Sequence, residues 1–559
     1  MKIALAQINS TVGDIKGNTA RIIAYIAKAK AMKVDLVVFP ELCICGYPPK
    51  DLLLKKDFLK EIQKNLQRIV KSSKGISVIV GTVVAGSKAL KPINYDVSMS
   101  ADFPGYMLNN AAAFISNGKF IGSQAKTYLP TYDIFDEQRY FVPAKDSRVF
   151  ELRKQKIGIA ICEDIWVDNK PIQRLKDNGA DTIINISSSP FYIGKYKVRQ
   201  DLVKKRALDN KVPIFYINLV GGQDDLVFDG GSFGYDEKGR LVASSKRFEE
   251  DFVIVDVEQQ KNRHSLPDYP VNPVKEKIME IYSALVLGLR DYVEKNGFNK
   301  VVLGLSGGID SALVACLAQS ALGSKRVILV LMPGPFSSKG SVTDSIKLCN
   351  NLKIEPRIIP INDTYNSYLK TLKPEFKSLP FGVAEENIQA RVRGNILMAL
   401  SNKFGYLVLI TGNKSEMSVG YSTLYGDMAG GFAPISDVPK MMVYKLCQYI
   451  NEIGKREKRA VIPESIFKKA PSAELRADQT DQDDLPSYNI LDKIIHLYIE
   501  ENKGIDEIVK MGFNKTVVLD IIRRIDHNEY KRFQAPLGIK ITPKAFGFGR
   551  RMPITNAFK

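Results

Sequence analysis

The sequence has little histidine: three in 559 residues, at positions 264, 496 and 527. Residues 1–263 therefore contain no imidazole, although histidine is the side chain that most often acts as a general base near neutral pH. Any hydrolytic chemistry in the first half of the chain must take its base from another side chain, such as a carboxylate whose pKa is raised by burial.

Cysteine and long apolar runs are scarce too. The six cysteines are too sparse for a disulfide framework, and Cys43-x-Cys45 has neither the spacing nor the second pair of a zinc site. No apolar run approaches the roughly 18 residues that span a bilayer. The first residues, MKIALAQINSTVGD, turn polar too early for a secretory signal. We therefore expect a protein of the reducing cytoplasm, with no membrane partner.

The chain also lacks charge balance. Its 80 lysines and arginines exceed its 61 aspartates and glutamates, for a formal net charge of +19. Such a charge suits polyanions, either nucleic acid or phosphorylated small molecules. The lysines are dispersed rather than gathered in one tail, so a solvated lysine-rich surface explains the charge more simply.

The length predicts more than one domain. A chain of 559 residues corresponds to three or four domains of about 150 residues, or to two large α/β units. Residues 258–273 (EQQKNRHSLPDYPVNP) hold three prolines and no apolar period, as a linker does. We predict a domain over residues 1–260, a linker over residues 261–273 and a second domain over residues 274–559.

Short apolar segments and helical patterns alternate in the first domain. Residues 18–30 have the period of an amphipathic helix. Strands are expected at residues 2–8, 34–39, 76–84, 110–115, 156–161, 182–186 and 214–219. The pattern predicts a layered α/β fold that is rich in strands.

Three side chains in this domain stand where strands end. Glu41 follows the expected strand 34–39, Lys126 follows a strand-like FIGS, and Cys162 comes at the end of strand 156–161. A lone cysteine is more often structural than catalytic. With no histidine present, however, a desolvated glutamate could deprotonate the thiol. A nearby lysine would stabilise the thiolate and the oxyanion that forms when it attacks a carbonyl.

The second domain opens with a pattern that suits phosphate. Residues 301–319 (VVLGLSGGIDSALVACLAQ) predict a buried strand, a tight SGG turn and a helix opened by Asp310. Glycines allow φ > 0 and a close approach to an anion, and a helix N-terminus points free N–H groups at it. The turn lacks the lysine of GxxxxGK[ST], and GxGxxG is absent. A glycine-rich turn without a ligand is the alternative.

A carboxylate beside bound phosphates implies a cation. Asp310 would repel the phosphates unless a divalent ion such as Mg²⁺ lies between them. Residues 406–411 (YLVLIT) predict another strand, and Glu416 lies just beyond it, where it would supply a second carboxylate. The alternation of strands and helices predicts a doubly wound parallel sheet with ligands beyond the carboxyl ends of its strands.

Three later segments carry polar side chains that admit two interpretations each. The helix expected at residues 385–400 (EENIQARVRGNILMAL) has Asn387 and Arg391 on one face, which would bind a ligand or simply face solvent. Residues 468–486 are polar and unpatterned, as in a disordered linker or a lid. The basic residues 528–555 would also suit a nucleic-acid arm.

Two resemblances narrow these alternatives. Glu41, Lys126 and Cys162, in FPEL, K-x-x-LP and CEDIW, resemble the triad of the nitrilase superfamily. SGGIDS resembles the pyrophosphate loop of enzymes that cleave ATP to AMP and pyrophosphate. End to end, the chain resembles the glutamine-dependent NAD⁺ synthetases. This resemblance implies an α/β chain with a four-layer αββα nitrilase-like domain. A doubly wound, Rossmann-like synthetase domain of the adenine nucleotide α-hydrolase type would follow it.

In the first domain the resemblance implies a glutaminase. Glu41 would be the general base, Lys126 the oxyanion-stabilising residue and Cys162 the nucleophile, with Glu137 as a second catalytic glutamate near the lysine. The residues implied to hold glutamine are Tyr47, Tyr132, Ser189 and Lys195.

In the second domain the resemblance implies amidation of nicotinic acid adenine dinucleotide (deamido-NAD) to NAD⁺, driven by ATP. Mg²⁺ would be held by Asp310 and Glu416, and residues 468–486 would form a lid. The implied ATP-binding residues are Gly304, Leu305, Ser306, Gly307, Gly308, Ile309, Asp310, Ser311 and Thr411. The implied deamido-NAD-binding residues are Asn387, Arg391, Glu416, Asp427, Lys440 and Lys531.

The resemblance also implies which molecules the chain meets. These are glutamine, ATP and deamido-NAD, no nucleic acid, and further copies of the chain in a homo-oligomer built on synthetase-domain dimers. Rival hypotheses are an amidotransferase that makes GMP or asparagine, a tRNA-modifying ATP pyrophosphatase, and a non-catalytic scaffold. The acceptor that supports pyrophosphate release tests the first, and salt-dependent tRNA binding would favour the second. Unchanged glutamine use in Cys162→Ala would favour the third.

Overall fold

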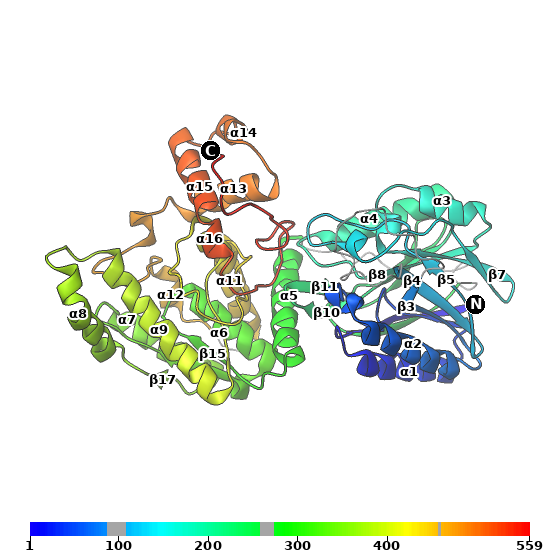
Figure 1. The fold of residues 1–559 in the computed structure, drawn as a ribbon, viewed down its shortest axis with the longest axis horizontal. Coiled ribbons are helices and arrows are strands. Elements are labelled where there is room, and N and C mark those ends of the chain that lie inside the picture. The colour runs from blue at the N-terminus through cyan, green and yellow to red at the C-terminus, as the bar shows by residue number, and fades with distance from the viewer. Residues whose placement is uncertain (86–107, 258–272, 457–459, 559) are drawn as a thin grey trace, which may run out of the picture. The chain divides into compact units, whose positions relative to one another are not determined.

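The computed structural model describes residues 1–85, 108–257, 273–456 and 460–558. The chain divides into two compact units, one of residues 1–223 and 227–271, the other of residues 224–226 and 272–559. The linker predicted at residues 261–273 lies outside the described residues, except for Pro273, with which α5 begins. Figure 1 shows both units and labels many of their elements.

One six-stranded sheet of the first unit has the strand order β14-β1-β2-β3-β4-β5. Its strands β1, β2 and β3 are parallel, whereas β14, β4 and β5 run antiparallel to their neighbours. Helices α1 (Ile15–Ala31) and α2 (Lys56–Ser72) pack against each other, and α2 packs on the sheet. The strands are β1 (Lys2–Gln7), β2 (Leu36–Val38), β3 (Ser77–Ala85), β4 (Leu108–Ser116), β5 (Lys119–Ala125) and β14 (Asp251–Asp256).

A second six-stranded sheet has the order β13-β12-β9-β8-β7-β6, and its central strands β7, β8 and β9 are parallel. Helices α3 (Lys170–Asp177) and α4 (Lys195–Asn210) pack on it. The strands are β6 (Val149–Leu152), β7 (Gln155–Ile161), β8 (Thr182–Ser187), β9 (Ile214–Asn218), β12 (Phe233–Tyr235) and β13 (Leu241–Ser244). Strands β10 (Val220–Gln223) and β11 (Leu226–Asp229) pair separately.

The two sheets share one apolar core. Leu5 and Phe114 from the first sheet meet Ile159 and Ile186 from the second, and none of the four is more than 1% exposed. Burying one such side chain stabilises the fold by about 1.5–3 kcal/mol. Figure 1 shows α1 and α2 on one side of the strands and α3 and α4 on the other. The four-layer αββα architecture predicted for the first domain is therefore confirmed.

The second unit is built on a parallel sheet of order β17-β16-β15-β18. Helices α6 and α7 pack against β15 and β16, and α5 packs on α6. Val302, Val330 and Val408 pack instead against α8 and α9, so helices cover both faces and the sheet is doubly wound, as predicted. These elements are α5 (Pro273–Lys295), β15 (Val301–Gly304), α6 (Ile309–Leu322), β16 (Val327–Leu331), α7 (Lys339–Leu352), β17 (Arg357–Ile358), α8 (Asn362–Phe376), α9 (Val383–Phe404) and β18 (Leu407–Val408).

The position of β15 decides where a ligand can bind. Strand β15 lies between β16 and β18. The chain therefore adds β16 and β17 on one side of β15 and β18 on the other, so the strand order reverses at β15. In parallel sheets a ligand-binding crevice forms at such a point, beyond the carboxyl ends of the strands. Strand β18 is shorter than the expected 406–411. Leu409 bridges to Phe432, and the Ile410 N–H donates to the Phe432 carbonyl (3.0 Å). The segment 409–413 therefore leaves the sheet at the crevice.

The regular elements in the remaining described part of this unit are helices. Its apolar cluster is formed chiefly by α13 and α15, for example by Leu491 and Ile521. Among the helices of the described residues, none combines the length and the apolar character needed to cross a bilayer. The helices are α10 (Lys414–Val419), α11 (Lys440–Arg456), α12 (Glu464–Lys468), α13 (Tyr488–Ile495), α14 (Ile505–Lys510), α15 (Lys515–His527) and α16 (Glu529–Arg532).

Candidate functional sites

Three strand ends in the first unit bring the predicted triad together. Glu41 lies three residues after β2, Lys126 follows β5 directly, and Cys162 follows β7 directly. Glu41 and Lys126 thus come from one sheet and Cys162 from the other. The charges of Glu41 and Lys126 both act on the Cys162 thiol, so the three side chains share one buried site.

A lysine shared by two carboxylates is the centre of this site. The Lys126 ammonium lies 2.8 Å from Glu41 Oε1 and 2.8 Å from Glu137 Oε1, and all three side chains are at most 5% exposed. Burial opposes the charge on Lys126, but the charges of Glu137 and Glu41 outweigh it and hold the lysine pKa above its ordinary value. Burial also raises the pKa of Glu137, against the charge of Lys126. The cluster therefore holds two carboxyl groups and one ammonium group, so the lysine can neutralise only one of them when both are ionised.

The Cys162 side chain rests as a thiol. Burial raises its pKa well above the ordinary value, and the charge of Glu41 adds to the rise while that of Lys126 opposes it. Cys162 has φ of +43°, in the left-handed region that a non-glycine residue rarely adopts. Such strain at a reactive side chain requires surrounding contacts that hold it.

Two polar groups that the sequence reasoning missed hold Glu41. The Asn110 Nδ2 donates to Glu41 Oε1 (2.7 Å), and the Ser188 N–H donates to Glu41 Oε2 (2.8 Å). Ser188 follows β8 and directly precedes the predicted Ser189. The signal in the sequence that could have identified Ser188 is its position, with Ser189, directly after an apolar strand.

The predicted glutamine-binding residues fall into two places. The Tyr132 hydroxyl donates to both oxygens of Glu163 (3.0 Å each), and the Lys195 ammonium lies over the Trp166 ring at 4.3 Å. Burial raises the pKa of Glu163, and the charge of Lys195 opposes that rise, so the two groups are near neighbours. Glu163, which sequence reasoning missed, lies between a phenol and a cation, next to Cys162.

The other two predicted residues lie deeper in the unit. The Tyr47 hydroxyl donates to Glu137 Oε1 (2.9 Å), so it belongs to the carboxylate cluster. The Ser189 N–H donates to the side-chain oxygen of Asn218 (2.9 Å), and Asn218 Nδ2 donates back to the Ser189 carbonyl (3.1 Å). Ser189 is thus buried beside the cluster rather than exposed in a loop.

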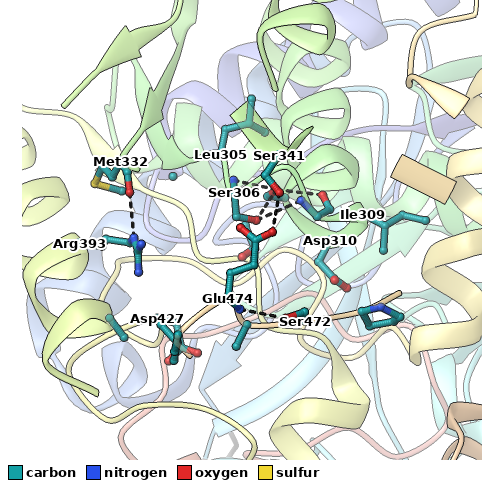
Figure 2. Close-up of a pocket in the computed structure, with 18 of the residues that line it drawn as sticks. Leu305, Ser306, Ile309, Asp310, Met332, Ser341, Arg393, Asp427, Ser472 and Glu474 are labelled. Atoms are coloured by element: carbon teal, nitrogen blue, oxygen red, sulfur yellow. Dashed lines mark hydrogen bonds between the residues drawn. The ribbon is translucent and has the colours of Figure 1, made fainter. Parts of the chain in front are cut away.

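A cavity of about 290 Å³ lies at the crevice of the second unit. Figure 2 shows side chains from the SGG turn, α6, α7 and α9 turned toward this space. The predicted residues that line it are Gly304, Leu305, Ser306, Gly308, Ile309, Asp310, Ser311, Thr411, Glu416, Asp427 and Lys440. The structure therefore brings three segments to one cavity: the one that follows β15, the one that follows β18, and the glycine-containing segment 419–440 that joins α10 to α11.

The SGG turn has the geometry of an anion site. Gly307 has φ of +80°, and a Cβ there would lie 2.6 Å from the Ser341 carbonyl oxygen, so glycine is required. The Gly308 N–H donates to Ser306 Oγ (3.3 Å), and Ser311 Oγ donates to the Gly308 carbonyl (3.0 Å). The turn leads into the first residues of α6, where free N–H groups and the helix dipole favour phosphate.

Two carboxylates and a lysine lie beside this turn. The Lys440 ammonium is 2.6 Å from Asp310 Oδ2 and 3.5 Å from Glu416 Oε1, and Asn413 Nδ2 donates to Asp310 Oδ1 (2.9 Å). Burial raises the pKa of Glu416 to about 8, with the charge of Lys440 opposing the rise and that of Asp310 adding to it. Asp310 and Glu416 thus lie side by side beside the turn, and carboxylate oxygens are ligands that Mg²⁺ prefers.

The donor set fits magnesium better than a transition metal. Within the part of the chain that the structure describes, no cluster of three or more His, Cys, Asp or Glu side chains could enclose a metal ion. Asp310 and Glu416 supply two oxygen ligands, and Mg²⁺ typically takes its remaining ligands from water and substrate phosphates. The cavity is open to such phosphates at the adjoining turn.

Three predicted substrate-binding residues hold a loop instead of lining the cavity. Asn387 Oδ1 accepts from Thr423 Oγ1 (2.6 Å), and Arg391 Nε donates to the Leu424 carbonyl (3.3 Å). Lys531 Nζ donates to the carbonyls of Gly420 and Ser422 at 2.8 and 2.9 Å. All three residues therefore contact positions 420–424, in the loop that presents Asp427 to the cavity.

Several cavity residues lie in segments that the sequence pattern left open. Glu474 Oε1 accepts from Ser341 Oγ (2.8 Å), from Ser338 Oγ (3.0 Å) and from Lys469 Nζ. Figure 2 shows the Glu474 carboxylate directed toward Ser306 and Ser341. Arg393 Nε donates to the Met332 carbonyl (3.0 Å), two residues beyond the predicted Arg391. The polar segment 468–486 thus contributes to the cavity wall, from Lys469 to Leu475 and at Asp481.

Comparisons with known proteins agree with the two-unit architecture. The family described as carbon-nitrogen hydrolase matches residues 2–264, and the family described as NAD synthase matches residues 281–535. A solved glutamine-dependent NAD⁺ synthetase from Acinetobacter baumannii, in complex with adenosine diphosphate, has a TM-score of 0.77 at 40% identity. The match covers 99% of this chain and 98% of that one. A synthetase from Cytophaga hutchinsonii, at 22% identity and a TM-score of 0.82, shares the fold over 100% and 98% of the two chains.

Curated relatives match over the full length. The glutamine-dependent NAD⁺ synthetase of Thermotoga maritima is 45% identical over 592 residues, which cover 100% of this chain and 99% of the relative. That of Aquifex aeolicus is 46% identical over 591 residues, with all of both chains covered. Because these matches extend over both units, the whole chain belongs to the family of glutamine-dependent NAD⁺ synthetases.

Proposed function

We propose that the two units carry the two halves of one ligase reaction. Residues 1–260 hydrolyse glutamine to glutamate and ammonia, and residues 274–559 use ATP and that ammonia to convert deamido-NAD to NAD⁺, with AMP and pyrophosphate as the other products. The observation that carries this proposal is the Lys126 ammonium, 2.8 Å from both Glu41 and Glu137, in a buried site that contains a cysteine. The full-length relatives named above catalyse, by their names, glutamine-dependent NAD⁺ synthesis.

Glutamine hydrolysis in this proposal uses the carboxyl and ammonium groups that lie beside Cys162. Glu41 accepts the Cys162 proton as the sulfur attacks the side-chain amide carbon of glutamine, and Lys126 stabilises the oxyanion that forms. The amide nitrogen leaves as ammonia after it takes up the proton from Glu41. Water then attacks the thioester, glutamate leaves, and the sulfur recovers its proton.

Recognition of glutamine is supported by opposite charges around Cys162. Glutamine carries an ammonium and a carboxylate on its α-carbon. The Glu163 carboxylate, held by the Tyr132 hydroxyl at 3.0 Å, suits the ammonium, and Lys195 suits the carboxylate as a point charge. Ser189 and Tyr47 lie deeper, where they would fit against the side-chain amide.

The second unit activates a carboxylate that ammonia cannot attack directly. The nicotinate carboxylate oxygen attacks the α-phosphorus of ATP, pyrophosphate leaves, and ammonia then attacks the carbonyl carbon of the adenylate to release AMP. The turn Ser306–Ser311 receives the phosphates through its N–H groups, with Gly304, Leu305 and Thr411 beside the nucleotide. The solved relative at 40% identity holds an adenine nucleotide, adenosine diphosphate.

Substrate binding in the second unit uses charge and loop position. Lys440 supplies a cation at the turn, while Asp427 and Glu416 border the same cavity. In this proposal Asn387, Arg391 and Lys531 act on deamido-NAD binding by holding positions 420–424 of the loop that presents Asp427. Asp310 and Glu416 would hold Mg²⁺, which neutralises phosphate charge when it is bound.

We also propose a homo-oligomer in the cytoplasm. The six cysteines carry free thiols, which suits a reducing compartment. The second unit exposes neighbouring apolar side chains at Leu379, Phe381 and Val383, the kind of surface that a further copy covers. Light scattering on the purified chain measures the mass, and a monomer at working concentration would contradict the assembly.

A product assay tests the proposed reaction. The purified chain is supplied with deamido-NAD, ATP and Mg²⁺, with either glutamine or ammonium as the nitrogen donor, and NAD⁺, AMP and pyrophosphate are measured. All three products are expected in equal amounts with both donors. Pyrophosphate release with xanthosine monophosphate or aspartate in place of deamido-NAD would identify a different acceptor and contradict the proposal.

A further inference from the structure

The Asp164 side chain binds backbone groups outside its own turn as well as within it. Its side chain is 2% exposed and accepts three backbone hydrogen bonds. Oδ2 accepts from the Ile161 N–H (3.0 Å), and Oδ1 accepts from the N–H groups of Thr127 (2.9 Å) and Tyr128 (2.8 Å). A carboxylate offers about four acceptor sites on its two oxygens, and Asp164 uses three of them for backbone N–H groups.

The three donors belong to the two segments that carry the reacting groups. Ile161 directly precedes Cys162, and Thr127 and Tyr128 directly follow Lys126. The last two donors lie 37 and 36 residues away from Asp164 in the chain, on the strand end of the other sheet. One carboxylate therefore joins the end of β7 to the end of β5.

A simple turn cap would not need this arrangement. To cap its own turn, Asp164 needs the Ile161 contact alone, since that bond closes the 3-10 turn Cys162–Ile165. The turn is also held from behind, because Arg206 Nε on α4 donates to the Ile165 carbonyl (3.2 Å). The two bonds to Thr127 and Tyr128 are additional, and they reach toward Lys126.

The Lys126 segment is anchored on its other side as well. The Lys126 N–H donates to the Asn110 carbonyl (2.8 Å), and the Lys126 carbonyl accepts from the Ala144 N–H (2.8 Å). Those bonds place Lys126 relative to β4, in its own sheet. The contacts of Asp164 place the same segment relative to the Cys162 turn, in the other sheet.

We propose that Asp164 is a positioning residue for glutamine hydrolysis, which holds the strained Cys162 turn and the Lys126 segment in register with each other. The inference rests on the glutaminase assignment proposed above. It concerns how the sulfur and the oxyanion-stabilising ammonium are aligned, and Asp164 itself touches neither substrate nor reacting atoms. Loss of the brace lets the two strand ends move independently, and alignment of nucleophile and oxyanion stabiliser is lost first.

The electrostatics of Asp164 supply an independent readout. Burial raises the pKa of Asp164 to about 7, against the N–H groups of Tyr128, Ile161 and Thr127 and the charge of Lys126. The charge that acts on it is that of Lys126 from the first sheet, while Arg206 from α4 binds the carbonyl of the next residue, Ile165. Protonation near neutral pH converts one acceptor oxygen into a hydroxyl, which weakens the brace as pH falls through 7.

Asp164→Asn tests the brace in the full-length chain. The amide keeps one acceptor oxygen but turns an NH₂ toward a backbone N–H, so at least one of the three bonds is lost. Expected is a fall of about 10- to 100-fold in kcat for glutamine hydrolysis, with KM within a few-fold of wild type. The matched control is Asp168→Asn, whose carboxylate accepts from Lys170 N–H at the surface, and it is expected to keep wild-type activity.

The pH profile separates positioning from a purely structural role. Wild type is expected to lose kcat below about pH 7 in part through Asp164, whereas Asp164→Asn lacks this ionisation and its acid limb moves to lower pH. A wild-type kcat in Asp164→Asn, a loss confined to KM, or an unchanged acid limb would each overturn the inference. If Asp164→Asn does not fold, Asp164→Ser, which leaves one acceptor, is measured in the same way.

The outcome is distinguishable from failure of the proposed function. Cys162→Ala and Asp164→Asn are compared in the same assay of glutamine hydrolysis. If Cys162→Ala retains hydrolysis, the glutaminase assignment fails and the inference fails with it. If Cys162→Ala is inactive while Asp164→Asn is fully active, the assignment stands and the positioning role of Asp164 alone is wrong.

Discussion

At the scale of single residues, buried charge stands in for the missing imidazole. Glu41, Lys126 and Glu137 lie together in the interior of the first unit, where an isolated charge costs several kcal/mol. The ammonium offsets one carboxylate, and Asn110 together with the Ser188 N–H satisfies Glu41. A second carboxyl group remains beside this pair, and in the proposed mechanism Glu41 is the proton acceptor that replaces histidine.

Lys126→Met is expected to destabilise the first unit as well as abolish glutamine hydrolysis. The change leaves two buried carboxylates without their shared cation, and breaking a buried pair from one side costs about 3–5 kcal/mol. Burial already raises the pKa of Glu137, and without the lysine no ammonium charge opposes that rise. Stability is then retained at low pH and lost as pH rises through the folded-state pKa of Glu137.

Thermal unfolding from pH 5 to pH 8 measures this effect. The melting temperature of Lys126→Met should fall steadily across the range, relative to wild type. Lys119→Met, at the exposed start of β5, is the matched control and should melt like wild type at every pH. A pH-independent difference between Lys126→Met and wild type would contradict the buried-charge argument.

At the scale of elements, two loops meet at the crevice of the second unit. The SGG turn precedes α6, and the N-terminus of α7 adjoins it, because Gly307 lies against the backbone of Ser341. Glu474 then approaches Ser341 from the polar segment 468–486. The anion site is therefore assembled by one strand-to-helix turn, one helix N-terminus and one covering segment.

Gly307→Ala is expected to remove synthesis of NAD⁺ from both nitrogen donors. A Cβ at this position meets the Ser341 backbone at 2.6 Å and φ is +80°, so the turn must deform. Glutamine hydrolysis should persist, because Cys162 lies in the other unit. The matched control is Gly405→Ala at the C-terminal end of α9, where φ is +69°, ψ is +30° and no atom lies within 4 Å of the added Cβ. That variant should lose about 1 kcal/mol of stability and keep synthesis.

Glu474→Gln is expected to tighten the binding of inorganic pyrophosphate. The Glu474 carboxylate already occupies the hydroxyls of Ser338 and Ser341 and the ammonium of Lys469, so an incoming anion competes with it. A like charge about 4 Å away costs about 1 kcal/mol even at the dielectric constant of water, which is about fivefold in affinity. Calorimetric titration measures it, with exposed Glu464→Gln on α12 as the control. Weaker binding in Glu474→Gln would mean that Glu474 supports the ligand instead of opposing it.

At the scale of the whole molecule, two different chemistries share one chain. One unit has a thiol in a buried carboxylate–ammonium cluster, and the other has a phosphate turn with two carboxylates and a lysine. Each unit has its own core, with contiguous apolar clusters that do not depend on the other site. We therefore expect that the two activities can be inactivated one at a time.

Cys162→Ala is expected to abolish NAD⁺ synthesis from glutamine and to leave synthesis from ammonium within about twofold of wild type. The substitution removes the sulfur nucleophile, and removal of a nucleophile costs several orders of magnitude in rate. Added ammonium bypasses the missing step, because the second unit requires only ammonia. NAD⁺ formation with each donor is followed by product chromatography. Loss of synthesis with both donors would show that the units do not divide the work in this way.

Local sequence predicted where strands end better than it predicted which residues contact the side chains at those ends. Glu41, Lys126 and Cys162 were expected to follow strands, and β2, β5 and β7 do end within three residues before them, but their roles came from the resemblance to the nitrilase superfamily. The SGG turn was found in the same way, between β15 and α6. Glycine, charge and the end of an apolar run are all visible in a few consecutive residues.

The residues that hold these groups were missed, for a reason of distance along the chain. Ser188 donates to a carboxylate 147 residues away, and Glu474 accepts from a hydroxyl 133 residues away. No local pattern marks such pairs, because each partner looks like an ordinary serine or glutamate. Asn387, Arg391 and Lys531 show the converse, since the pattern marked them but their contacts at positions 420–424 depend on how a loop folds back.

The sequence by itself determined the two kinds of unit, their order, and the chemical groups at the ends of particular strands, because hydrophobic periodicity and strand-end residues are local properties. Only the tertiary structure decided that two sheets face each other with Lys126 between two glutamates. It also decided that β15 lies between β16 and β18 with the cavity beyond them. These arrangements come from packing between segments far apart in the chain, where the burial of many side chains at once selects one register among the alternatives.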